Sequence, residues 1–221
     1  MGNYPRYYLR YFICTAFLTH IGHSGKVIVM RVFLAALVLI FSLQSIVRAD
    51  DIRDLKIEGM SVGDSLLDYF SEKEIKDNLM VYDYKDKTFS TAEFFKTDFN
   101  YKLYDIVIAN FKANDKNYII YAIGGVVDYK NINKCYEKKN KIAEEISSLL
   151  RDAKKEEDHK VRTKDPNAEF MSYIWYFTKE GDRVSIECYD FKSNNEYNAY
   201  DQLRIGILES EMWSWLQNDA Y

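Results

Sequence analysis

The segment with the clearest chemical potential is a glycine–serine motif near residue 60. Residues 59–63 read Gly-Met-Ser-Val-Gly and match the G-x-S-x-G pattern of a nucleophile elbow, in which a sharp turn exposes a serine. His159 follows downstream and is a candidate base for a hydrolase. However, such an elbow normally follows several parallel strands, whereas the strands predicted in this chain are antiparallel. We therefore interpret Ser61 as a helix N-cap and assign no catalytic residue.

His159 carries no other sign of catalysis. It lies in the most hydrophilic stretch of the chain, which favours a solvent-exposed side chain. The sequence contains no G-x-G-x-x-G, P-loop, H-E-x-x-H or C-x-x-C motif, so neither a cofactor nor a metal ion is expected. A small hydrolase of undefined chemistry stays as the alternative function, and a base within hydrogen-bond distance of Ser61 would favour it.

Aromatic side chains offer the best candidate for binding. The sequence contains 19 Tyr and 3 Trp residues, and such side chains often form surfaces that bind sugars or proteins. Most of them are expected to pack on a sheet, because aromatic residues favour strands. Trp213 and Trp215, near the end of the chain, are the candidate binding surface for an unidentified protein or cell-envelope ligand.

The first 49 residues differ in charge from the rest of the chain. They contain five basic residues and no Asp or Glu, whereas the remaining 172 residues carry 25 Lys or Arg against 34 Asp or Glu. A basic and apolar head is typical of a targeting segment and is kept apart from the fold. The acidic remainder argues against nucleic acid as a partner, because nucleic acid requires a basic surface.

Residues 30–49 have the parts of a signal peptide. Met30 and Arg31 form a short basic start, an apolar run follows, and small residues precede the end at Ala49 as in an A-x-A-like cleavage site. Cleavage between Ala49 and Asp50 leaves residues 50–221 as the mature domain. Residues 1–29 are too long for an ordinary n-region, so we interpret them as an upstream extension and Met30 as the start of translation.

The signal peptide predicts a periplasmic or secreted protein. No Asn lies in an N-x-Ser/Thr acceptor site, which favours a bacterial host, and we expect a Gram-negative one. The alternative is an inner-membrane protein anchored by residues 27–47, which are near the roughly 20 residues that span a bilayer. Contact with a membrane is expected only through such an uncleaved segment.

Two cysteines, Cys135 and Cys188, lie in the predicted mature domain. An exported chain enters an oxidising compartment, so one intramolecular disulfide is the simplest interpretation. Two buried free thiols are the alternative. A metal site is disfavoured, because two thiols and the one mature histidine do not supply three or four ligands.

The predicted mature domain has the length of a single folded unit. Ser61 and Ser71 are predicted to open two short helical segments, the second through a capping box with Glu74. Alternating apolar residues then predict three strands, at residues 80–84, 105–111 and 118–124. The last two are joined by a turn at Ala-Asn-Asp-Lys. Gly124 and Gly125 mark a bulge or a close backbone approach.

The second half of the mature domain repeats this mixture. Asn131 is predicted to cap a long helix with Cys135, Ile142 and Ile146 on its buried side, and Lys139 facing elsewhere. The charged residues 151–165 predict a solvated loop. Three further strands are predicted at residues 171–178, 183–191 and 203–208. Residues 212–216 close the chain as a short helix or an extended tail. The fold class is α+β: a single domain with an antiparallel sheet and one long helix packed on a face, in the order α-β-β-β-α-β-β-β.

Three segments carry a resemblance to a known group of proteins. They are residues 59–66 (Gly-Met-Ser-Val-Gly-Asp-Ser-Leu), the Gly124-Gly125 pair that precedes Cys135, and residues 188–191 (Cys-Tyr-Asp-Phe). Over most of residues 55–210 the chain resembles small exported proteins of AT-rich marine alphaproteobacteria. The resemblance implies export and a Cys135–Cys188 pairing, and brings no known activity. The function expected is therefore a non-enzymatic binding or interaction module.

The intact mass of the protein from its own host's envelope fraction tests the predicted processing. We expect a chain that begins at Asp50 and gains about 2 Da on reduction, because one disulfide takes up two hydrogen atoms. A chain that still contains Met30 would show that residues 27–47 remain as an anchor. Two free thiols would contradict the disulfide.

Overall fold

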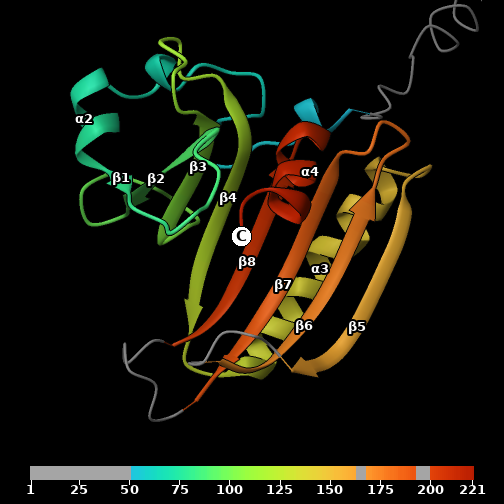
Figure 1. Ribbon diagram of the computed structural model, residues 1–221. Helices are drawn as coiled ribbons and strands as arrows, with labels where there is room; N and C mark the ends of the chain where they lie inside the picture. The colour runs from blue at the N-terminus through green and yellow to red at the C-terminus, as the bar shows by residue number, and fades with distance from the viewer. Residues whose placement is uncertain (1–50, 163–167, 193–199) are drawn as a thin grey trace, which may run out of the picture. The chain divides into compact units, whose positions relative to one another are not determined.

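The computed structural model describes residues 51–162, 168–192 and 200–221. These residues belong to one compact unit, which spans Arg48–Tyr221. The predicted cleavage site between Ala49 and Asp50 lies outside the described residues. The described part is an α+β domain with one antiparallel sheet and a long helix on one face, which confirms the predicted fold class (Figure 1).

The sheet has eight strands in the order β1-β2-β3-β4-β8-β7-β6-β5. Each half is a run of sequential antiparallel neighbours, and the pairing of β4 with β8 joins the two halves. The strands of the first half are β1 (Leu79–Met80), β2 (Phe89–Phe95), β3 (Ile106–Lys112) and β4 (Ile120–Tyr129). Those of the second half are β5 (Lys154–Arg162), β6 (Ala168–Phe177), β7 (Arg183–Phe191) and β8 (Asp201–Leu208).

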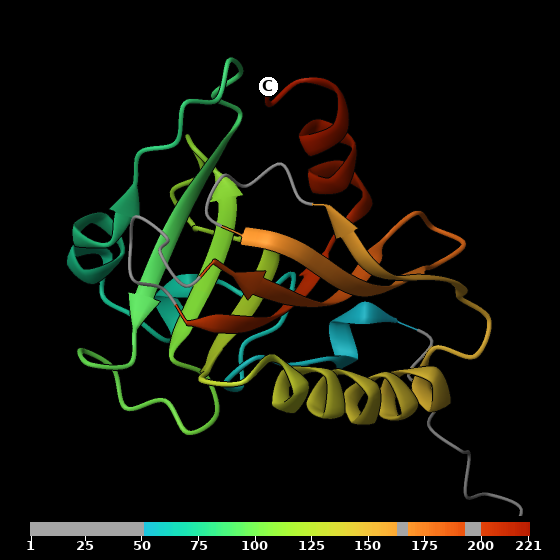
Figure 2. The same ribbon diagram turned by 90° about the horizontal axis from the view of Figure 1, so that it is seen from below.

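Helix α3 (Ile132–Leu149) carries the chain from β4 at the centre of the sheet to β5 at its far edge. Asn131 caps this helix as predicted, because its side chain accepts a hydrogen bond from Asn133 N. The helix packs on one face of the second half and contacts β7, β8 and β4. The segment with the short 3-10 helices η1 (Ile52–Asp54) and η2 (Leu66–Asp68) lies on the same side of the sheet (Figure 2).

The opposite face carries α4 (Ser210–Asn218), so the predicted short C-terminal segment is helical (Figure 2). The first helical N–H, at Ser210, donates to Asp182 Oδ1 at 2.8 Å, so the turn between β6 and β7 holds the start of α4. Met212 and Trp215 are buried there in a small second core with Phe89 and Ala122. The main core lies on the α3 side.

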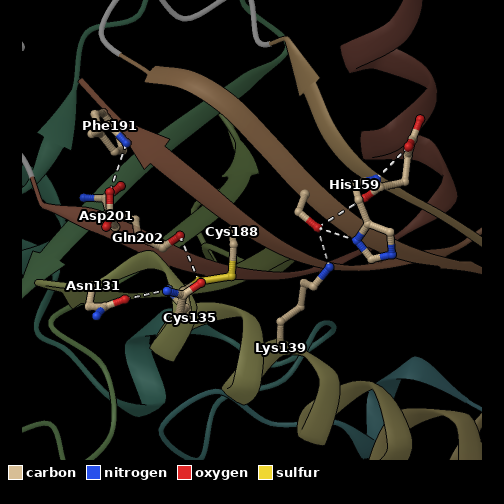
Figure 3. Close-up of a disulfide and its surroundings, with 11 residues drawn as sticks. Asn131, Cys135, Lys139, His159, Cys188, Phe191, Asp201 and Gln202 are labelled. Carbon is tan, nitrogen blue, oxygen red and sulfur yellow. Dashed lines mark hydrogen bonds between the residues drawn. A yellow bond between two sulfur atoms is a disulfide. The ribbon is translucent and has the colours of Figure 1, made fainter.

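The Cys135–Cys188 disulfide joins the first turn of α3 to the middle of β7, with 6.0 Å between the two Cα atoms (Figure 3). Both cysteines are fully buried. The structure therefore contains the single intramolecular disulfide that the two cysteines predicted.

Three local predictions were wrong. Residues 151–165 are not a loop throughout, because β5 forms within them as an edge strand. Ser61 is not an N-cap; Ser65 caps η2 instead, and its side chain accepts from Leu67 N. Lys139 faces the sheet, because the buried residues of α3 are Cys135, Lys139 and Ala143, each one turn apart. The predicted order also lacked β2.

Removal of the disulfide should lower the free energy of unfolding. The bond closes a loop with a sequence separation of 53, and the loop-entropy model gives about 4 kcal/mol for a loop of this length. We expect that loss in the Cys135→Ser/Cys188→Ser double variant, measured by urea unfolding with circular dichroism. Reductant should destabilise the wild type by the same amount and leave the stability of the double variant unchanged. Equal stability of the variant and the oxidised wild type would contradict the prediction.

Candidate functional site

A cleft of about 430 Å³ opens between α3 and the sheet. A cavity of this size is in the range of small-molecule sites, which are mostly apolar with a few polar groups. Its floor is made by Leu203, Ile205 and Ile207 of β8, and Val127 and Tyr129 of β4 form the side. The interior of the cleft is therefore mainly aliphatic.

The cleft exists because α3 meets the sheet through a narrow stripe. Its buried residues are Cys135, Lys139 and Ala143, of which Ala143 has a small side chain. Ile142 and Ile146 lie beside this stripe, are only half-buried, and line the cleft. The helix thus holds its aliphatic flank away from full contact with the sheet.

The wall opposite α3 is fixed by a turn at Glu58 and Gly59. Both residues have a positive φ, of 49° and 93°, and the flanking Ile57 and Met60 pair as in a hairpin. The Glu58 carboxylate accepts hydrogen bonds from the backbone N–H groups of Leu103, at 2.6 Å, and Tyr104, at 3.2 Å. One side chain therefore holds the loop that forms the rim.

The ring of Tyr104 packs against Gly125 of β4, whereas Gly124 lies against the backbone of β8, where an added Cβ atom would be 3.0 Å from the backbone oxygen of Ile205. A Cβ atom on Gly125 would lie 2.3 Å from Tyr104 Cδ1, so only glycine leaves room for the ring. Burial and the nearby Glu58 raise the pKa of Tyr104 to about 12. The phenol is therefore neutral at physiological pH and acts as part of the wall.

Charge at the mouth of the cleft is mainly positive. Lys56, Lys102 and Lys138 line the mouth with exposed side chains, and Glu145 is the one acidic residue there. None of the three lysine side chains has an ion-pair or hydrogen-bond partner among the described residues. Residues 50–221 carry 34 acidic against 25 basic side chains, so the excess of lysine at this mouth is opposite in sign to the net charge of these residues.

The sequence motif at Ser61 does not form a nucleophile site. Ser61 is buried, and its hydroxyl is shared between the backbone carbonyls of Arg53, at 2.7 Å, and Leu55, at 2.8 Å. Its backbone N–H donates to Asp64 Oδ2 at 2.9 Å. The two hydroxyl bonds tie Ser61 to the backbone of residues 53–55, and neither of them involves a base.

The two tryptophans proposed as a binding surface have different surroundings. Trp215 is buried, and its indole N–H donates to Asp86 Oδ1 at 2.7 Å. Trp213 is half-buried and stacks on the guanidinium of Arg183, which also lies over Trp175, with 4.1 Å from the guanidinium carbon to each ring. The pair therefore does not form one continuous surface.

His159 is exposed, as expected, but its Nδ1 lies 3.1 Å from the hydroxyl of Ser172, which also accepts a hydrogen bond from the buried Lys139. No sequence motif pointed to this group, because its members come from α3, β5 and β6.

Within the described ranges, no set of three or more His, Cys, Asp or Glu side chains is arranged to hold a metal ion. The helices described there are too short or too polar to cross a membrane.

Comparisons with known proteins gave no relative. No family model matches the chain, and searches of curated proteins and of solved structures found no match.

Glu58 should make the rim of the cleft sensitive to acid. Burial raises the pKa of its carboxyl, but the backbone N–H groups of residues 102–104 lower it by more, so the pKa lies below its ordinary value. Its contribution to stability is therefore present above the unfolded-state pKa of about 4.3 and is lost as the pH falls through the lower pKa of the folded state.

We expect Glu58→Gln to lower the free energy of unfolding at pH 7 by about 1–2 kcal/mol, because a charge-assisted hydrogen bond becomes a neutral one. The difference from the wild type should shrink as the pH falls through the lowered pKa of the folded-state carboxyl, because the wild-type side chain is then protonated as well. Urea unfolding at several pH values measures both effects. Glu144→Gln, at an exposed position of α3, is the matched control. A difference that does not depend on pH would contradict the assignment.

Proposed function

We propose that this protein is an exported module whose large cleft binds a small amphipathic anion. The observation that carries the proposal is the combination of an aliphatic interior with three lysines at the mouth that have no ion-pair partner in the described part of the chain. An apolar body in the cleft would remain in contact with Ile142, Ile146 and Ile205, while a carboxylate or similar group would reach the lysines. The ligand class is therefore an apolar chain or ring with one anionic end.

The apolar interior supports affinity, and the lysines support selectivity. Each buried methylene group contributes about 0.8 kcal/mol, so a ligand with several such groups gains most of its binding free energy in the interior. Exposed lysines act through solvent and contribute about 1 kcal/mol or less each. They favour an anion over the neutral alcohol of the same length, and salt should weaken that preference.

Export supports a ligand from the cell envelope or its surroundings. The signal peptide at residues 30–49 would deliver the mature domain to the periplasm, and the disulfide suits that oxidising compartment. An anchored form through residues 27–47 would present the same cleft at the inner membrane. Both forms bind the same class of ligand.

Titration with a fluorescent fatty-acid analogue, a dansylated undecanoic acid, tests the cleft. We expect saturable binding that weakens about tenfold or more in the Lys56→Glu/Lys102→Glu/Lys138→Glu variant, because three attractive charges become repulsive. Lys141→Glu changes the same charge on an exposed position of α3 outside the cleft, and should bind as the wild type does.

A second variant separates the interior from the mouth. Ile142→Trp fills the cleft from α3 and should abolish binding of both the acid and the corresponding dansylated alcohol. The charge-reversal variant should lose the acid and keep the alcohol. Binding that survives Ile142→Trp in a folded protein would place the ligand elsewhere and overturn the proposal.

A further inference from the structure

A lysine, a serine and a histidine meet on the flank of α3 that faces β5. Lys139 Nζ donates a hydrogen bond to Ser172 Oγ at 2.6 Å, and His159 Nδ1 lies 3.1 Å from the same oxygen (Figure 3). The Ser172 hydroxyl also donates to the backbone carbonyl of Asp158 at 3.2 Å. The side chains of Lys139 and Ser172 are buried, with 1% and 2% of their surface exposed.

Lys139 is buried without a carboxylate partner. No acidic oxygen within the described residues lies within ion-pair distance of its Nζ, and the nearby Glu157 is paired with Lys155 at 2.7 Å. Burial lowers the pKa of Lys139 below the ordinary value for lysine; Glu157 opposes this shift and Lys155 adds to it. Lys139 therefore loses its proton more readily than an exposed lysine does, and the neutral amine that results has a lone pair that can accept a proton.

A separate cavity of about 280 Å³ gives access to this group. It is lined by Tyr136, Asn140, Lys139, His159 and Ser172. Tyr136 and Asn140 lie on one flank of α3, whereas Lys138 and Ile142, which line the large cleft, lie on the other. The two cavities are therefore independent sites.

We propose that Ser172 is a nucleophile for small acyl esters that enter this cavity, with Lys139 as its general base. A serine hydroxyl needs an adjacent base to attack a carbonyl, and a lysine amine held at hydrogen-bond distance is one of the recurring solutions. The cavity fits a short acyl group beside the Tyr136 ring. This activity lies beyond the proposed binding function and uses none of the residues of the cleft.

The reaction balances with water as the only co-substrate. The Ser172 hydroxyl proton passes to Lys139 Nζ as Oγ forms a bond to the carbonyl carbon, and the ester C–O bond breaks while Lys139 returns the proton to the leaving alcohol. Water then attacks the acyl-serine and gives a proton to Lys139; the acyl–Oγ bond breaks as Lys139 returns that proton to Ser172 Oγ, which releases the acid and restores both residues. His159 is a positioning residue, because its Nδ1 holds Oγ from the exposed side.

A fluorophosphonate probe, which forms a stable bond to activated serines with loss of fluoride, tests the proposal on the mature protein. We expect labelling that peptide mass mapping places on Ser172 and that Ser172→Ala abolishes. Ser61→Ala, which removes the serine of the G-x-S-x-G motif, should leave the labelling of Ser172 intact. A folded wild type that is not labelled, or labelling that survives Ser172→Ala, would overturn the proposal.

The role of Lys139 needs a readout that a structural role would not change. The labelling rate should rise with pH through the pKa of Lys139, and Lys139→Met should lower the rate about 100-fold or more and remove that rise, as expected for a general base. His159→Ala should lower the rate much less and keep the pH profile. If thermal melting shows that Lys139→Met is unfolded, the wild-type and His159→Ala pH profiles decide; profiles that follow His159 instead would overturn the assignment of Lys139.

Discussion

The Cys135–Cys188 disulfide fixes where α3 meets the sheet, and both cavities depend on that position. The helix must carry the chain from β4 to β5 across the second half of the sheet, and the bond sets its first turn on β7. Lys139 and Ala143 follow one and two turns later, so they are the residues that meet the strands. Because this stripe is narrow, a cleft remains on one flank of the helix and a smaller cavity on the other.

Most strands with an apolar pattern were predictable, whereas β2 and the charged strand β5 were not. The two hairpins at β3–β4 and β6–β7 follow runs of apolar residues, which periodicity detects. β5 consists mostly of charged residues and lies at an edge, where charge protects a strand from unwanted pairing. Its side chains pair two residues apart, as in Lys154–Glu156 and Lys155–Glu157. Opposite charges two residues apart lie on the same face of a strand, but a search for apolar periodicity does not detect them.

The serine in a recognisable motif is not the serine that lies beside a lysine and a histidine. Ser61 lies in a recognisable motif, but its bonds to nearby carbonyls show that the motif serves the backbone. Ser172 lies in an ordinary strand sequence, and its two partners are 33 and 13 residues away along the chain. Only the packing of α3 on β6 and the edge position of β5 bring them together. Likewise, the cleft lysines come from three separate segments, and their common position could not be derived from spacing.

The position of Lys139 is hard to explain by stability alone. A buried ammonium loses its hydration, and one hydrogen bond to a serine does not replace it, so an apolar side chain of similar length would suit a helix–sheet interface better. Polar groups that break the local pattern in this way are concentrated where function opposes stability. For Lys139, the loss of stability and the ability to act as a base have one cause. The burial that disfavours the charged lysine also stabilises the neutral amine, which is the form that can take a proton from Ser172.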